Sequence, residues 1–363
     1  MRELFLLDPE VTFLNHGSFG ACPRVVFDRY QYWQRELERE PVEFIARRLP
    51  GLLAEARAEL AAYVGAAADD ITFVQNATTG VNMAARALGL GPDDEVLSTD
   101  LEYGACVLTW QRTCRFLQVD VDELFEHVTE RTRAVYVSHI TSATGLLLPV
   151  EEIVARARAL ELATIVDGAH AAAHVDLDLD ALGADFYAGT CHKWLCAPKG
   201  AGFLHVRPEW QERVDGPIVS WGYEEPATFI SRTERQGTRD AAAYLTVPAA
   251  IAFQREHDVR ERCVALAREA RRELCALLET EPIAPESMVL QMATVRLPAP
   301  DTELQAWLFD EHRIEVPVRR DGSSFRVSIA AYNDRGDVDR LLSALRRRPG
   351  RRGRDGDGDG DCG

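Results

Sequence analysis

Between residues 71 and 206, short apolar runs alternate with segments in which apolar residues recur at helical spacing. The runs predict strands because they are rich in β-branched and aromatic residues: ITFVQ, EVLSTD, RFLQVD, AVYVSHI, ATIVDGA, DFYAGT and GAGFLHVRP. Helices are predicted between them over residues 78–88, 105–113 and 151–161. This alternation is typical of an α/β domain with a mostly parallel sheet in a large domain and helices on both faces.

The pattern changes on both sides of this region. A helical stretch is predicted over residues 24–63, with breaks near Pro41 and Pro50. Residues 248–280 are charged, have apolar residues at helical spacing and predict one long bridging helix. Strands and helices then mix, which predicts a small C-terminal α+β domain. The expected segments are an arm (1–22), a large domain (23–250), the bridging helix with the small domain (251–346) and a disordered tail (347–363).

Composition excludes several classes of protein. The 363 residues carry a formal net charge of −17, which argues against a nucleic-acid or anionic-membrane partner. No apolar run is long enough to span a membrane, and the N-terminal apolar stretch is too short for a signal peptide. The eight cysteines form no CxxC pair or zinc-spaced cluster, and the tail's DGDGDG lacks the bidentate acid of a calcium loop. We therefore expect a cytoplasmic protein without a metal.

Candidate chemistry is concentrated in residues 166–204. Only Lys193 and Lys199 are lysines among the 41 basic residues, which fits a bias toward GC-rich codons, yet arginine cannot replace a reactive primary amine. Asp167 ends one predicted strand and Lys193 follows another, so both would face the crevice at the carboxyl ends of the strands. Pyridoxal phosphate is bound by such a pair: a desolvated lysine bonds to its aldehyde, and an aspartate pairs with its protonated ring nitrogen. A surface lysine and an unrelated strand-end aspartate remain the alternative.

The chain resembles the class V aminotransferase family of pyridoxal-phosphate (PLP) enzymes, which have fold type I. The resemblance rests on LLDPEVTFLNHGSFG, QNATTGVN, VDGAH, AGTCHKW, ERQGTRD and RVSIAAYN and runs from about residue 6 to 347. It implies PLP as cofactor, a homodimer with shared active sites, and a small amino-acid substrate. Within the family the chain is most similar to members that epimerise an amino acid at Cα in antibiotic biosynthesis, which implies specialised metabolism.

The resemblance also implies roles for individual residues. Lys193 matches the lysine that bonds to the cofactor and moves the Cα proton, and Asp167 matches the partner of the ring nitrogen. Tyr103 matches the aromatic residue stacked on the ring and a candidate second proton donor, although it could be an ordinary strand-end tyrosine. The remaining cofactor contacts implied are Ala77, Thr78, Thr79, Thr190 and His192 around the phosphate, Thr238 from the neighbouring subunit, and Ser142 and His170 near the phenolic oxygen.

The helix N-terminus at Ala77 has its own physical rationale, because free N–H groups and the helix dipole hold a phosphate there. The alternative is that the two threonines serve only as helix caps, which is their common use. For the substrate, Arg326 matches the arginine that grips the α-carboxylate. Asn15, His16 and Gly17 match a loop that relatives fold over the substrate, and Arg47 is a candidate for a second carboxylate.

Three reactions remain open at this stage. They are epimerisation at Cα, β-elimination by a C–S lyase acting on a cysteine conjugate, and transamination. Residues 276–325 contain no cysteine, which argues against a persulfide-forming desulfurase. The segment 221–235 is shorter than in the epimerising members, so the substrate could have diverged. A non-catalytic scaffold is disfavoured because Lys193, Asp167, His192 and Arg326 are all present.

Overall fold

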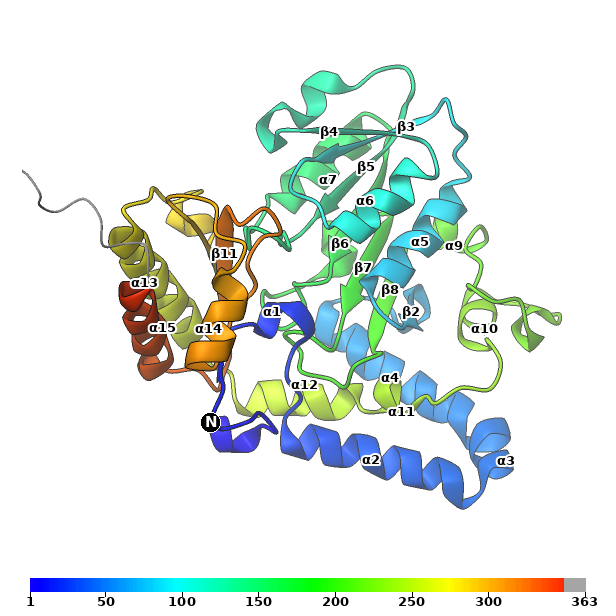
Figure 1. The fold of residues 1–363 in the computed structure, drawn as a ribbon. Helices are drawn as coiled ribbons and strands as arrows, with labels where there is room; N and C mark the ends of the chain where they lie inside the picture. The colour runs from blue at the N-terminus through cyan, green and yellow to red at the C-terminus, as the bar shows by residue number, and fades with distance from the viewer. Residues whose placement is uncertain (349–363) are drawn as a thin grey trace, which may run out of the picture.

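A seven-stranded sheet forms the centre of the computed structural model, which describes residues 1–348 (Figure 1). The strand order is β2-β8-β7-β6-β5-β3-β4, and β8 runs antiparallel to both neighbours while the other neighbours are parallel. The predicted mostly parallel sheet is therefore confirmed. The strands are β2 (Ile71–Val74), β3 (Glu95–Thr99), β4 (Arg115–Val119), β5 (Thr132–Ser138), β6 (Ala163–Gly168), β7 (Phe186–Thr190) and β8 (Gly202–Val206).

Helices cover both faces of this sheet, as predicted. On one face α5 (Ala77–Leu88) and α6 (Gly104–Gln111) share an apolar cluster with Phe186 and Ala188 of β7. Tyr187, between them, points to the opposite face and belongs to the second cluster. Successive side chains of a strand alternate between faces, so one strand supplies both cores. The helices of that second face are α4 (Leu49–Val64), α7 (Val150–Ala159) and α12 (Val247–Glu256).

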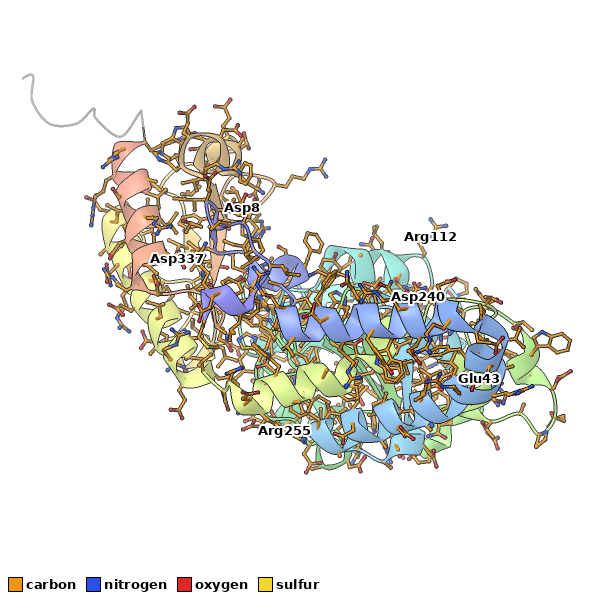
Figure 2. The ribbon with its side chains drawn as sticks, turned by 90° about the horizontal axis from the view of Figure 1, so that it is seen from below. Asp8, Glu43, Arg112, Asp240, Arg255 and Asp337 are labelled. Carbon is orange, nitrogen blue, oxygen red and sulfur yellow. The ribbon has the colours of Figure 1, made fainter. Side chains whose placement is uncertain are left out.

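The N-terminal helices lie below the sheet in Figure 1, and Figure 2 shows them from below. Helix α2 (Arg24–Arg39) ends before Pro41, which begins the short α3 (Pro41–Glu43), so the break predicted there is confirmed. A π-helical turn, Phe44–Arg48, leads into α4. Pro50 lies in the first turn of α4 rather than ending a helix, at a position where its missing N–H costs nothing.

The small domain has its own apolar core on α13 (Arg260–Leu278), the antiparallel strands β9 (Met292–Arg296) and β11 (Ser324–Ser328), and α15 (Arg335–Arg347). The single helix predicted over residues 248–280 is wrong, because the chain breaks between α12 and α13. Asp258 accepts a hydrogen bond from the backbone N–H of Arg260 and starts a separate helix there. The other short elements are β1 (Thr12–Phe13), α1 (His16–Phe19), α8 (Leu179–Leu182), α9 (Pro208–Gln211), α10 (Phe229–Glu234), α11 (Ala242–Leu245), α14 (Leu304–His312) and β10 (Ile314–Glu315).

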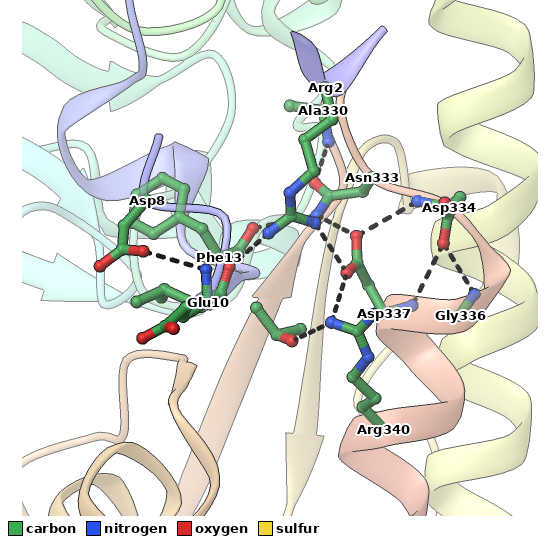
Figure 3. Close-up of polar contacts among 12 residues, drawn as sticks. Arg2, Asp8, Glu10, Phe13, Ala330, Asn333, Asp334, Gly336, Asp337 and Arg340 are labelled. Atoms are coloured by element: carbon green, nitrogen blue, oxygen red, sulfur yellow. Dashed lines mark hydrogen bonds and ion pairs between the residues drawn. The ribbon is translucent and has the colours of Figure 1, made fainter. Parts of the chain in front are cut away.

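The first residues of the chain are fixed to the small domain. Strand β1 pairs in parallel with β10, and Arg2 donates to the buried carboxylate of Asp337 at 3.1 Å (Figure 3). Asn333 also donates to Asp337, at 3.0 Å, and to the Phe13 carbonyl. This polar network joins the arm to α15 although more than 300 residues separate them.

No helix within residues 1–348 is both long and apolar enough to cross a bilayer. Arg347 closes α15 and Arg348 forms an ion pair with Asp301. The rest of the predicted tail, including its DGDGDG stretch, lies outside the described residues. The domain boundaries drawn from the sequence remain a prediction.

Candidate active site

Lys193 lies in the loop that follows β7, and its amine nitrogen is 3.0 Å from Nε2 of His170. The indole N–H of Trp194 donates to Nδ1 of the same ring at 3.2 Å. Because an indole only donates, Nδ1 must be the acceptor, and in the neutral ring Nε2 therefore carries the proton. That N–H donates to the amine lone pair, which favours neutral lysine. Burial acts in the same direction and lowers the pKa of Lys193 to about 8.

Asp167 lies at the end of β6, where its carboxylate is only 3% exposed. One oxygen accepts from the backbone N–H of Ala169 at 2.9 Å, and the other from the Tyr136 hydroxyl at 3.2 Å and the Cys106 thiol at 3.6 Å. Burial raises the pKa of Asp167. No lysine, arginine or histidine among the described residues forms an ion pair with it. A protonated ring nitrogen would supply the missing cation.

The start of α5 faces the Lys193 loop. Asn76 caps this helix, because its side chain accepts from the backbone N–H of Thr79 at 2.9 Å, so the threonine-cap alternative is wrong. The backbone N–H of Ala77 donates to Thr190 Oγ1 at 3.4 Å, which brings the helix start beside the end of β7. His192 uses Nδ1 toward the Ala201 carbonyl, at 3.1 Å, and has Nε2 left for a ligand. Thr78, between Ala77 and Thr79, belongs to the same first turn, which suits a phosphate.

Arg326, on β11, is a buried cation without a carboxylate partner among the described residues. The side chain is 6% exposed, and its hydrogen bonds go to the Ser142 carbonyl and, at 3.4 Å, to Ser18 Oγ. Its Nε has no partner at all, and burial lowers the pKa of Arg326 to about 10. A cavity of about 280 Å³ borders it, lined also by Ser18, Ser142 and the half-exposed Tyr103. A substrate carboxylate would pair with this guanidinium.

The N-terminal arm reaches the site, but His16 does not face the cavity. The ring is fully buried, with Nδ1 3.0 Å from the Tyr332 hydroxyl and Nε2 3.0 Å from the carbonyl oxygen of Lys193. The carbonyl can only accept, so Nε2–H donates to it and Nδ1 accepts from the tyrosine. Burial lowers the pKa of His16 to about 4 and keeps it neutral. The expectation that His16 contacts the substrate is therefore corrected: Nε2 holds the main chain of Lys193 and Nδ1 is occupied by the Tyr332 hydroxyl.

Asn15 and Gly17, the residues on either side of His16, are connected to Arg326 through Ser18 and by direct packing. Asn15 donates to Glu315 at 3.1 Å and accepts from Ser18 at 2.5 Å. Gly17 packs so tightly that a Cβ there would lie 3.1 Å from Nη2 of Arg326 and 2.6 Å from Met292 Sδ. The arm thus forms one wall around the guanidinium.

Two predicted residues lie apart from this group within the single chain. Thr238 is exposed and lines a groove with Trp221 and Ile45. Arg47 is exposed on the π-helical turn. Neither forms a hydrogen bond or ion pair with Lys193, Asp167 or Arg326.

The sequence analysis missed Glu102, which also lines the cavity. Its carboxylate accepts from the backbone N–H and hydroxyl of Ser138, at 3.1 and 2.5 Å, and from the Thr99 hydroxyl at 2.6 Å. Burial raises the pKa of Glu102 to about 7. The available signal was an acidic residue three positions after the end of β3 and directly before the candidate stacking tyrosine.

Comparison with known proteins adds independent findings. The model of the family described as Aminotransferase class-V matches residues 23–341. The chain is 40% identical to isopenicillin N epimerase of Amycolatopsis lactamdurans, over 95% of this chain and 97% of the relative. It is 36% identical to isopenicillin N epimerase of Streptomyces clavuligerus, over 95% and 96%. The solved structure of C-DES with glycine covalently linked to the PLP cofactor superposes with a TM-score of 0.85 at 24% identity, over 95% and 98%.

Proposed function

Since the chain belongs to the class V aminotransferase family, whose members are PLP enzymes, we propose that it epimerises an amino acid at Cα, as its isopenicillin N epimerase relatives do. One observation carries the proposal. Within a single site, Asp167 is a buried carboxylate without a paired cation, Arg326 is a buried cation without an anion, and burial lowers the pKa of the Lys193 amine to about 8. An amino-acid substrate and PLP together supply the missing charges.

The residues around Lys193 fit PLP. Asp167 would hold the ring nitrogen, His170 would donate to the phenolic oxygen from Nε2, and the first turn of α5 with Thr190 and His192 would hold the phosphate. When bound, the cofactor withdraws electrons from Cα of the substrate, which makes the Cα proton acidic.

The chain's own residues then decide the reaction. Arg326 binds the α-carboxylate, which fixes how the substrate presents Cα. The amine of Lys193 accepts the Cα proton on one face, and His16 holds the main chain of Lys193 through its carbonyl oxygen. Epimerisation needs a donor on the opposite face, and we place Tyr103 there, because Tyr103 and Glu102 both line the cavity beside Arg326. Transamination is the third candidate. It would return the proton to an atom other than Cα, so it would not use a donor on the opposite face of Cα.

A C–S lyase is the second candidate, and C-DES favours it. Another solved structure describes C-DES as a cystine C–S lyase in complex with cysteine persulfide, with a TM-score of 0.81 at 24% identity. A lyase needs only the Lys193 side of the site, because the β-substituent leaves and no second proton donor is required at Cα.

Incubation with candidate amino acids in deuterated water separates the reactions. We expect deuterium at Cα with a product of mixed configuration, read by NMR and chiral chromatography. Pyruvate with a released thiol would instead establish the lyase, and a cofactor left in its amine form the transaminase. Lys193→Arg should be colourless and inactive, and borohydride should fix the cofactor to Lys193 in the parent protein. A yellow, active Lys193→Arg variant would refute the assignment.

We further propose that the protein is a cytoplasmic homodimer. Thr238 and Arg47 do not reach Lys193 in their own chain, while Ile218, Val219 and Trp221 expose apolar surface nearby. A partner subunit would use that surface and bring Thr238 to the phosphate. Mixing inactive Lys193→Ala with weakened Thr238→Ala should restore up to a quarter of the activity through hybrid sites, whereas independent sites would give no recovery.

The seven described cysteines are all free thiols, as a reducing compartment requires.

A further inference from the structure

Asp70, Asp180 and His205 meet at the end of the sheet opposite Lys193. Asp70 directly precedes β2, whereas Lys193 follows the carboxyl end of β7, which runs parallel to β2. His205 lies near the end of β8, and this strand runs in the opposite direction. Asp180 extends from α8. One ligand atom from each residue lies within 4.8 Å of the other two.

His205 is the unusual member of this cluster because it is buried without a hydrogen bond. The residue is 2% exposed, and Nδ1 has no partner. Nε2 points at the cluster, 3.6 Å from Oδ1 of Asp180. The backbone pairs with Ile71 on one side and Tyr187 on the other, so the ring is fixed in this direction. In this place Nδ1 loses its hydrogen bond with water and gains none in return.

The two carboxylates are also uncompensated. Neither Asp70 nor Asp180 pairs with a lysine or arginine within residues 1–348. Gln211 donates an amide N–H to Oδ1 of Asp70 at 2.6 Å, which leaves Oδ2 available.

We propose that Asp70, Asp180 and His205 form a site for a divalent cation of the Zn²⁺ class. One imidazole nitrogen and two carboxylate oxygens suit such borderline metals, whereas Ca²⁺ and Mg²⁺ prefer oxygen alone. Ligand atoms about 2.1 Å from zinc lie about 3.4 Å apart, so the cluster must contract slightly. Asp180 can do this because its side chain is more than half exposed. Water would complete the shell, and the ion would join α8 and the start of β2 to β8.

Because this site lies away from Lys193, it is independent of the proposed epimerase reaction. The expected role is structural: the ion stabilises the folded state by mass action and leaves the catalytic constants unchanged. Nδ1 of His205 lacks the acceptor that usually orients a zinc-bound histidine, which predicts modest affinity.

Calorimetric titration of metal-free holoenzyme with ZnCl₂, together with thermal unfolding, tests the site. All proteins compared carry Cys362→Ser, so that the thiol of Cys362 cannot bind Zn²⁺. We expect one equivalent of Zn²⁺ to bind and raise the unfolding temperature. Asp180→Asn should weaken binding at least about tenfold without changing the unfolding temperature of the metal-free protein. Asp93→Asn, an exposed aspartate elsewhere, is the matched control and should bind like the parent.

Asp70→Asn provides a second variant that keeps the buried histidine and should weaken binding by a similar factor. The proposal is overturned if the parent takes up no Zn²⁺, or if both aspartate variants bind it as tightly as Asp93→Asn does. A larger unfolding shift with Ca²⁺ than with Zn²⁺ would also contradict it, because the imidazole would then not be a ligand.

Discussion

At the residue scale, Lys193 combines burial with a hydrogen bond that a charged amine cannot accept. We predict that the rate at which PLP reattaches to the apoenzyme rises with pH through about 8 and then levels off, because only the neutral amine attacks the cofactor's aldehyde. Stopped-flow absorbance across pH 6 to 10 measures this midpoint. A midpoint near the ordinary lysine value of about 10.5 would contradict it. His170→Gln keeps a donor and should shift the midpoint less than His170→Phe.

Substitution of His16 tests whether catalysis requires the hydrogen bond that holds the Lys193 main chain. His16→Phe leaves the Lys193 carbonyl and the Tyr332 hydroxyl without partners, at about 1–3 kcal/mol of unfolding free energy each. We predict that kcat falls about tenfold while KM stays within about twofold, because the substrate does not touch the ring.

Tyr332→Phe should have a smaller effect, since the bond to Lys193 survives, and the exposed His127→Phe should have none. Steady-state kinetics and urea unfolding measure both quantities. If His16→Phe raised KM and left kcat alone, His16 would bind substrate after all.

At the scale of one element, the cap of α5 serves both stability and cofactor binding. Asn76→Ala removes the acceptor for Thr79 and should cost about 1 kcal/mol of unfolding free energy. Without its cap the first turn of α5 frays, so the N–H groups at the helix start lose their fixed direction and we also predict several-fold weaker retention of PLP. Asp334→Ala removes the cap of α15 and should cost similar stability with unchanged PLP affinity. Equilibrium dialysis and urea unfolding distinguish the two variants; equal PLP loss would remove α5 from the phosphate site.

Helices and strands could be predicted from the sequence where a single local pattern of apolar residues determines them. The strands around Asp167 and Lys193 follow from apolar runs, and their shared edge follows from parallel topology. The break at residues 257–259 was not predictable from spacing, because Asp258 acts through one side-chain hydrogen bond. Glu102 and Tyr136 acquire their contacts only when β3, β5 and β6 pair. Lys199 had no expected role, yet its amine donates to the Gly20 carbonyl at 3.0 Å.

At the scale of the molecule, many histidines are buried in the neutral form. Their folded pKa lies below the unfolded value of about 6.5, so their contribution to stability is complete above that pH and is lost as pH falls. Glu102, Asp167 and Glu234 have raised pKa values and oppose this trend, but they are fewer. The histidines with lowered pKa are His16, His139 and His192 (about 4), His174 (about 3), His170 and His205.

We therefore predict that the free energy of unfolding drops by about 2–4 kcal/mol between pH 6.5 and pH 5, at most about 1.4 kcal/mol per pH unit for each uncompensated histidine. Urea unfolding followed by tryptophan fluorescence measures it. His174→Gln keeps hydrogen-bonding atoms without a titrating group and should reduce the slope. A flat profile over this range would mean that the histidines are charged in the folded state.

The attachment of the arm has a consequence for the order in which the site is completed during synthesis. Arg2, Thr12 and His16 leave the ribosome long before their partners, which are Asp337, Ile314 and Tyr332. The central sheet needs nothing beyond residue 206 to pair its strands. The growing chain therefore assembles the sheet and Asp167 early, while the support that His16 gives to Lys193 waits until Tyr332 has been synthesised. Catalytic competence should consequently appear as a late event of biosynthesis, after the sheet has formed.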